Sequence, residues 1–234
     1  MIVIRYVWTS IATESRVPIT MHFITSVLVN LTDRTINRKS VLVNAEFKRI
    51  TTINLQSKFF SQLDIHSENL IQVYAKKGGV QGRKIKSIMV PLTQTDSVDV
   101  RRECVLKGLC VYLNEDPEKL VREYKNIESS QTAMAETVFG ILVIRKEGAE
   151  PSDDPEDVGI ILEGVEVLDE LGNVPFAVSI LLAVVYALNL SYPPELKYTF
   201  EALQKIIMEL DGNKLSIKGQ ALKTKLSRKF ETAH

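Results

Sequence analysis

Cysteine and histidine are scarce in this chain of 234 residues, which contains two cysteines and three histidines. Cys104 and Cys110 fall in one predicted helix, and a separation of six residues turns them to different faces of it. We therefore expect no disulfide and no shared metal ion, and we predict a reduced, intracellular setting, cytoplasmic or nuclear. His22, His66 and His234 lack partners at the spacings of a zinc site or a catalytic triad, so no cofactor is expected.

Net charge and long apolar runs are also absent. Lys plus Arg and Asp plus Glu both number 29, so the formal net charge is zero and no overall field attracts nucleic acid or an anionic membrane. The longest apolar stretch, residues 176–190, is interrupted by polar side chains and is shorter than the roughly 20 residues that span a membrane. We expect neither a membrane span nor a secretory signal.

The apolar pattern that is present predicts a single α+β domain over residues 56–234. In this fold a helical region is followed by a small, mainly antiparallel sheet and an antiparallel helical pair. Helical spacing continues from residue 57 to about residue 127. Ser97 (or Asp96) and Asp116 are N-cap residue types, and they stand where two of these helices are expected to begin.

The N-terminal segment, residues 1–55, has a different pattern. It contains short runs rich in Val, Ile and Thr, which predict strands over residues 2–7, 23–31 and 40–47. The alternative is that this segment is poorly packed and does not belong to the domain.

The period of the apolar residues shortens to two after the helical region. This change predicts strands over residues 138–145, 158–162 and 165–169. Glu163 and Gly164 separate the last two strands and suit a tight hairpin turn. A single bent strand with a bulge at Gly164 is the alternative interpretation.

Asn173 and Pro175 predict the start of the most apolar helix, which should be buried on most sides. The Pro-Pro pair at residues 193–194 ends it and begins the next helix, and Gly212 is expected to end that one. A further helix is predicted over residues 216–230. The second helix carries an apolar seam, which is either core or a partner-binding face, formed by Leu196, Phe200, Leu203, Ile207 and Leu210.

Four pieces of the chain carry a family resemblance: GLCVYLNEDPEKL at residues 108–120, FGILVI at 139–144, the stretch 159–210, and LKTKL at 222–226. They resemble a large fish multigene family whose members are often labelled sterile alpha motif domain-containing protein 3-like. Cys110 stands where that family usually has proline. The resemblance implies no activity, and no sterile alpha motif domain is recognisable in this chain.

Two segments are rich in lysine and arginine. Residues 76–86, KKGGVQGRKIK, contain no acid and are expected to form a solvated loop. Three residues rather than four separate Gly78 from Gly82, so this segment does not match a phosphate-binding P-loop. Together with residues 214–229 it is a candidate basic contact surface. The candidate residues are Lys76, Lys77, Arg83, Lys84, Lys86, Lys223, Lys225 and Arg228.

No catalytic motif is found, so we expect a non-enzymatic protein–protein interaction or regulatory module with an unidentified protein partner. The alternative is binding to nucleic acid or to a phosphate backbone through residues 76–86 and 214–229, which would be salt-sensitive and independent of base sequence. Glu163 and Glu166 flank the predicted turn and form a candidate carboxylate pair, although strand alternation also explains them as solvent-facing. The oligomeric state is left open.

Overall fold

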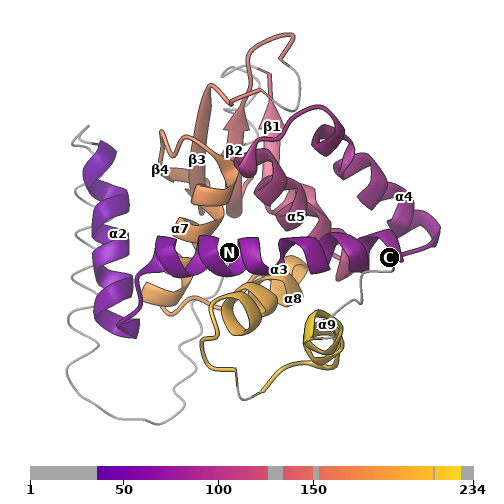
Figure 1. Cartoon of the computed structure of the whole chain (residues 1–234). Coiled ribbons are helices and arrows are strands. Elements are labelled where there is room, and N and C mark those ends of the chain that lie inside the picture. Colours follow the sequence, from indigo (N-terminus) through magenta and orange to yellow (C-terminus); the bar gives the residue numbers. More distant parts are fainter. Residues whose placement is uncertain (1–35, 126–133, 150–152, 213, 228–234) are drawn as a thin grey trace.

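A four-stranded sheet forms one side of the fold in the computed structural model, which describes residues 36–125, 134–149, 153–212 and 214–227. The strands follow the order β1 (Val121–Tyr124), β2 (Phe139–Ile144), β3 (Asp157–Leu162) and β4 (Val165–Leu168). β1 runs parallel to β2, and the other two pairs are antiparallel (Figure 1). Because side chains alternate along each strand, Ile141 and Val143 join the main core while Leu142 and Ile144 join a second cluster on the opposite face.

Helices cover one face of this sheet. α5 and α7 lie in front of it in Figure 1, and α9 lies below α3 and beside α8. The helices are α2 (Ile36–Thr51), α3 (Leu55–Ala75), α4 (Gly79–Ile88), α5 (Val98–Tyr112), α7 (Val174–Ala187), α8 (Lys197–Ala202) and α9 (Ile217–Ser227), and 3₁₀ turns occur at Val90–Thr93, Pro117–Lys119 and Pro194–Leu196. The α+β architecture expected from the sequence is therefore confirmed. Within the described part of the chain, no helix is both long and apolar enough to cross a membrane.

The hairpin between β3 and β4 forms as predicted. Glu163 and Gly164 have φ values of 54° and 78°, the left-handed pair that a two-residue hairpin turn requires. A Cβ at Gly164 would also lie 2.8 Å from the carbonyl oxygen of Ala135. The alternative of one bent strand is wrong, although the β3–β4 pairing does shift register between Ile160 and Ile161.

α7 is the central helix, as its composition predicts. The Asn173 side chain accepts a hydrogen bond from the backbone N–H of Phe176 at 2.8 Å, which caps the helix start. Most side chains of α7 are fully buried, including those of Ala177, Val178 and Ile180. α7 therefore needs no polar face, because other elements surround it on most sides.

The seam that follows the Pro-Pro turn belongs to the core, since its five residues are between 0% and 9% exposed. α8 continues into a π-helical turn over Leu203–Ile207, and the N–H of Met208 bonds to the carbonyl of Leu203 at 2.9 Å. The expected helix end at Gly212 is wrong. The helix ends at Ile207, and the chain turns through Glu209 and Asp211, which take φ values of 56° and 50°.

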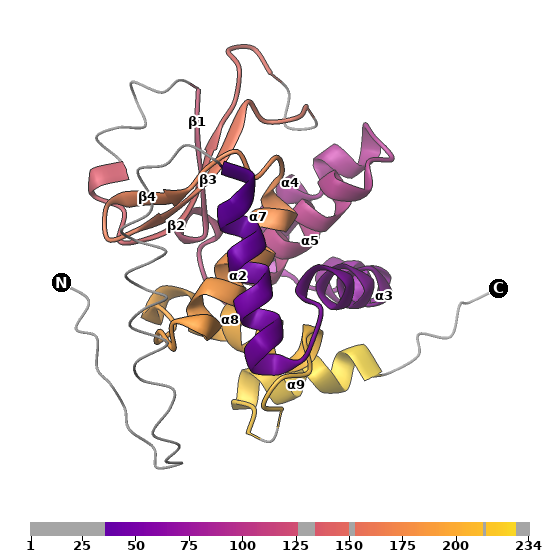
Figure 2. The same ribbon diagram turned by 90° about the vertical axis from the view of Figure 1, so that its left-hand side faces the viewer.

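The strand expected over residues 40–47 is wrong, because these residues lie in α2. Val43 and Phe47 are one helical turn apart and both 0% exposed, and the Phe47 ring meets the Tyr186 ring of α7 at 5.6 Å. Figure 2 shows α2 alongside α7, so this part of the N-terminal segment is packed. The β-branched residues of this segment favour a strand by local propensity. The residues that are buried against α7 are instead spaced one helical turn apart. The strands expected over residues 2–7 and 23–31 lie outside the described residues.

Two expectations in the helical region also need correction. The helix predicted after Asp116 is only the 3₁₀ turn Pro117–Lys119, because the chain then extends into β1 to pair with β2. The loop expected over residues 76–86 is mostly helix α4, which packs Ile85 and Gly82 inward. Gly82 is needed there, since a Cβ would collide with the backbone carbonyl of Lys77.

Candidate functional site

Lysines from separate segments surround two tyrosine rings on one side of the molecule. We call this the Lys–Tyr surface and define it by Lys77, Tyr112, Lys197, Tyr198, Lys218 and Lys225. Lys77 follows α3, Tyr112 is the last residue of α5, and Lys225 belongs to α9. The fold thus brings one lysine from each of the two basic segments to the end of α5.

Tyr112 is the centre of the first half of this surface. The Lys77 ammonium nitrogen lies 5.0 Å from the Tyr112 ring centroid, and that of Lys225 lies 5.4 Å from it. The Lys225 ammonium also donates a hydrogen bond to the Tyr112 hydroxyl at 2.8 Å. The ring in turn packs against Tyr74 with a centroid separation of 5.7 Å. Cation–π attraction of this kind applies to Lys77, whereas Lys225 is held at the edge of the ring by its hydrogen bond to the hydroxyl.

Tyr198 is the centre of the second half. The Lys218 ammonium lies 4.1 Å from its ring centroid and donates a hydrogen bond to the carbonyl of Leu113 at 2.9 Å. The Lys197 ammonium is 5.9 Å from the same ring. The backbone N–H of Tyr198 donates a hydrogen bond to the Glu115 carboxylate at 2.7 Å. This carboxylate therefore caps the start of α8.

A structural role accounts for part of this arrangement. α5 ends at Tyr112, and cations near a helix C-terminus offset the negative end of its dipole. The C-terminus of a helix carries only about half an elementary negative charge, and four lysines lie at this surface, which is more positive charge than the dipole needs. Among the described residues, no carboxylate pairs with Lys77, Lys197, Lys218 or Lys225 within ion-pair distance. An excess of positive charge is therefore available for a ligand.

The remaining candidate basic residues are not part of the Lys–Tyr surface as defined above. Lys76, Arg83, Lys84, Lys86 and Lys223 are all exposed. Arg228 lies outside the described residues. Asp153 of the acidic segment that begins at residue 147 lies near Arg145, because its carbonyl accepts a hydrogen bond from that buried side chain at 2.8 Å.

Sequence reasoning missed both tyrosines, because the basic segments themselves lack aromatic residues apart from Phe230. Tyr112 and Tyr198 come from other parts of the chain, and their positions depend on how α5 and α8 pack. Tyr112 carried one usable indication, since it ends a predicted helix at a position where cations are favoured.

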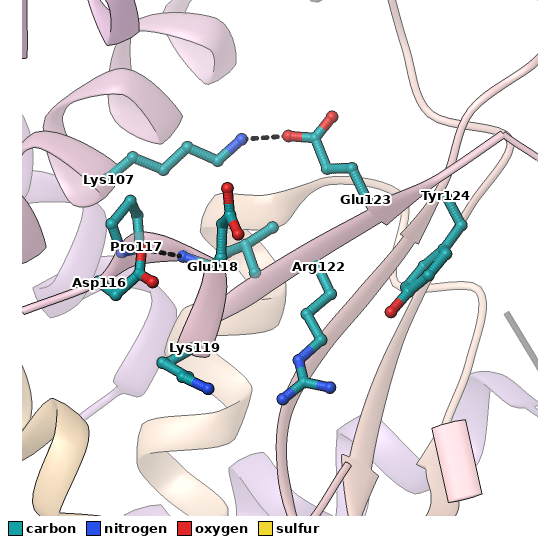
Figure 3. A pocket seen from close by; sticks show the side chains of 9 residues that line it. Lys107, Asp116, Pro117, Glu118, Lys119, Arg122, Glu123 and Tyr124 are labelled. Atoms are coloured by element: carbon teal, nitrogen blue, oxygen red, sulfur yellow. Dashed lines mark hydrogen bonds and ion pairs between the residues drawn. The ribbon is translucent and has the colours of Figure 1, made fainter. Parts of the chain in front are cut away.

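A second candidate is an open hollow of about 600 Å³ beside β1, seen in Figure 3. A neighbouring hollow of about 460 Å³ lies between α5 and the Val90–Thr93 turn. Lys107 and Glu123 line both. The first hollow is lined by equal numbers of acids and bases, namely Asp116, Glu118 and Glu123 with Lys107, Lys119 and Arg122. This balance favours no charged ligand.

Between the two hollows lies a network of two acids and two bases. Lys107 bonds to Glu103 at 2.6 Å and also to Glu123 (Figure 3), and Arg145 bonds to Glu123 at 2.7 Å and to Glu103 at 3.4 Å. Burial alone would lower the pKa of Lys107, but the charges of Glu103 and Glu123 outweigh it and raise that pKa. Burial would raise the pKa of Glu123, but Lys107 and Arg145 lower it. The four side chains thus pair with one another, which fits a structural role.

Glu163 and Glu166, the candidate carboxylate pair, lie in different surroundings. Glu163 is exposed in the turn, whereas Glu166 is partly buried and its carboxylate lies directly over Gly159. Burial, and then the charges of Asp157 and Asp169, raise the pKa of Glu166 to about 7. The relevant neighbours of Glu166 are therefore these two aspartates.

Glu166 is expected to make stability depend on pH. Its pKa rises from 4.5 toward about 7 on folding, so the folded state holds a proton that the unfolded chain has lost, and the free energy of unfolding falls as pH rises between those values. Allowing for solvent screening, Glu166→Gln should raise the free energy of unfolding at pH 8 by about 1 kcal/mol and have little effect below pH 4.5. Urea denaturation at both pH values measures this difference. Glu163→Gln is the matched control, and an equal response of both variants would contradict the assignment.

No group of three or more possible metal ligands occurs in the portion of the chain that the structure describes. Cys104 and Cys110 are both buried and unpaired, and burial raises the pKa of their thiols to about 11 and about 12. Neither thiol is therefore ionised at neutral pH, which does not suit a nucleophile or a metal ligand. Burial also lowers the pKa of His66.

A scan of protein-family models, a search of curated proteins and a search of solved structures each find no match to this chain. The resemblance to the fish family therefore stays a prediction. The fold and the site define an α+β protein whose most distinctive surface is basic and contains aromatic rings.

Proposed function

We propose that this protein is a non-enzymatic interaction module that binds an acidic segment of a protein partner through the Lys–Tyr surface. The observation that carries the proposal is the gathering of lysines from three distant segments around Tyr112 and Tyr198, with no carboxylate paired to them among the described residues. Like charges placed together raise the free energy of the unbound protein. An acidic ligand relieves that repulsion and is drawn to the surface.

An acidic peptide fits this surface better than a nucleic acid does. Binding of single strands draws much of its energy from bases stacked on free aromatic faces. Here Tyr112 already packs against Tyr74 and has two ammonium groups close to its ring. Tyr198 has Lys218 at 4.1 Å. Carboxylates need only the ammonium groups, which remain available. We also propose an intracellular setting, in keeping with two unpaired cysteines.

Reversing the charge of two lysines at Tyr112 should abolish most of the binding. A fluorescent peptide of alternating glutamate and glycine is the probe, and its anisotropy reports affinity. The double variant Lys77→Glu with Lys225→Glu should bind it at least about tenfold more weakly, since two attractive charges become repulsive. Binding to the unmodified protein should weaken as ionic strength rises from about 0.01 M to about 0.1 M, which shortens the screening length from ~30 Å to ~10 Å.

The matched control is the double variant Lys48→Glu with Lys146→Glu. It makes the same change in net charge at two exposed positions that are not part of the Lys–Tyr surface. It should bind as the unmodified protein does. If both double variants lose affinity equally, net charge and not this surface drives binding, and the proposal fails. A single-stranded oligonucleotide that binds tightly and displaces the peptide would replace the acidic partner with a nucleic acid.

A further inference from the structure

The hydroxyl of Tyr112 has an unused proton. Its partner Lys225 lies at 2.8 Å, and an ammonium group can only donate, so the phenolic oxygen is the acceptor in that bond. No described residue accepts a hydrogen bond from this hydroxyl in turn. The O–H group is therefore free to donate to a ligand, at a point where the Lys77 and Lys225 ammonium nitrogens are both within 5.4 Å of the ring centroid.

The position of this hydroxyl is set by the buried side of the ring. Tyr112 packs against Tyr74, which is 1% exposed and whose own hydroxyl donates to the carbonyl of Val105 at 3.0 Å. Tyr74 is thus held by a buried hydrogen bond within the core, and it supports Tyr112 from beneath. A donor that is positioned before the ligand arrives loses little conformational entropy on binding.

We propose that Tyr112, Lys77 and Lys225 form an anchor for one carboxylate group, in which the tyrosine hydroxyl donates to a carboxylate oxygen and the two ammonium groups neutralise its charge. This inference rests on the proposed function and names the contact that selects the acidic segment. A hydroxyl-to-carboxylate bond is charge-assisted and is roughly twice as strong as a neutral one. The anchor contains no arginine, whose planar fork favours bidentate recognition of phosphate, so a carboxylate is the better fit.

Tyr112→Phe tests the anchor, because it keeps the ring and its contact with Lys77 and removes the hydroxyl, together with the hydrogen bond that the hydroxyl accepts from Lys225. The affinity for the glutamate–glycine peptide should fall roughly tenfold, the scale expected when a bond to a charged group is lost. Tyr124→Phe is the matched control, since Tyr124 lines the hollow beside β1 and lies outside the Lys–Tyr surface, and it should change affinity less than about twofold. Thermal unfolding of both variants should match the unmodified protein, which shows that the fold is kept.

The outcomes separate this inference from the proposed function. If Tyr112→Phe binds the peptide as tightly as the unmodified protein while the charge-reversed double variant does not, the anchor is wrong and the proposed function stands. If the unmodified protein does not bind the peptide, the proposed function fails and the anchor fails with it. A phosphoserine peptide that binds more tightly than the glutamate peptide, and loses more from Tyr112→Phe, would overturn the assignment to a carboxylate.

Discussion

Replacing Phe200 with alanine is expected to lower the free energy of unfolding by about 3–5 kcal/mol. The Phe200 side chain is 0% exposed, and its ring centroid lies 5.4 Å from those of both Phe139 and Tyr192. Truncation removes the apolar transfer energy and leaves a cavity between β2 and the chain that precedes α8. Both rings also lose an aromatic partner, which adds to the cost.

Chemical denaturation of this variant measures the loss directly. Ile217→Ala is the control, because Ile217 is 87% exposed and its truncation should stay within about 0.5 kcal/mol. A loss below about 1 kcal/mol for Phe200→Ala would contradict the burial of the apolar seam. That result would restore the seam as a candidate partner-binding face.

Arg145→Met is the second substitution with a large expected effect, and it should lower the free energy of unfolding by about 3 kcal/mol. Arg145 is 8% exposed and donates to Glu123 at 2.7 Å, to the carbonyl of Asp153 at 2.8 Å and to Glu103 at 3.4 Å. Methionine keeps the length of the stem but removes the charge. Glu103 and Glu123 are then left with Lys107 as their shared partner. Removing one partner from a buried ion network lowers the free energy of unfolding by much more than the intact network raises it.

The loss corresponds to a fall in Tm of roughly 6–12 °C for a chain of this length. Lys146→Met is the matched control, since it removes the same charge from the next residue, which is exposed. It should shift Tm by no more than about 2 °C. Equal shifts in the two variants would show that the network around Arg145 is not intact in solution.

Elements whose local sequence and tertiary role agree could be predicted from the sequence. Asn173 caps α7, and Glu163 with Gly164 forms the hairpin turn, because cap and turn chemistry act within a few residues. α2 and β1 were mistaken because packing overrides local propensity in both. α2 follows the surface of α7, and β1 extends because β2 offers a parallel neighbour about twenty residues later in the chain.

The basic half of the candidate site could also be predicted, and its aromatic half could not. Lys77 and Lys225 lie in lysine-rich segments that composition identifies at once. Their meeting at Tyr112 depends on the angle at which α9 crosses the end of α5, and no pattern within either segment encodes that angle. The loop predicted around Gly82 is wrong for a related reason, since this glycine lies in α4 and leaves room for the backbone carbonyl of Lys77.

The Lys–Tyr surface and the rest of the fold have separate roles in this account. The apolar seam, the ion network and α7 stabilise the domain, and each has its partners inside it. The lysines at Tyr112 and Tyr198 differ from these elements, because they form no ion pair among the described residues. The binding function stays a proposal for this surface, and it rests on several lysines gathered around two tyrosine rings.

NMR mapping of the acidic peptide tests this central claim most directly. Isotope-labelled protein is titrated with the glutamate–glycine peptide, and amide shifts are followed residue by residue. The account predicts that the largest shifts cluster at Lys77, Tyr112, Tyr198, Lys218 and Lys225 and diminish as salt is added. Shifts confined to the hollow beside β1, or no shifts at low salt, would contradict it.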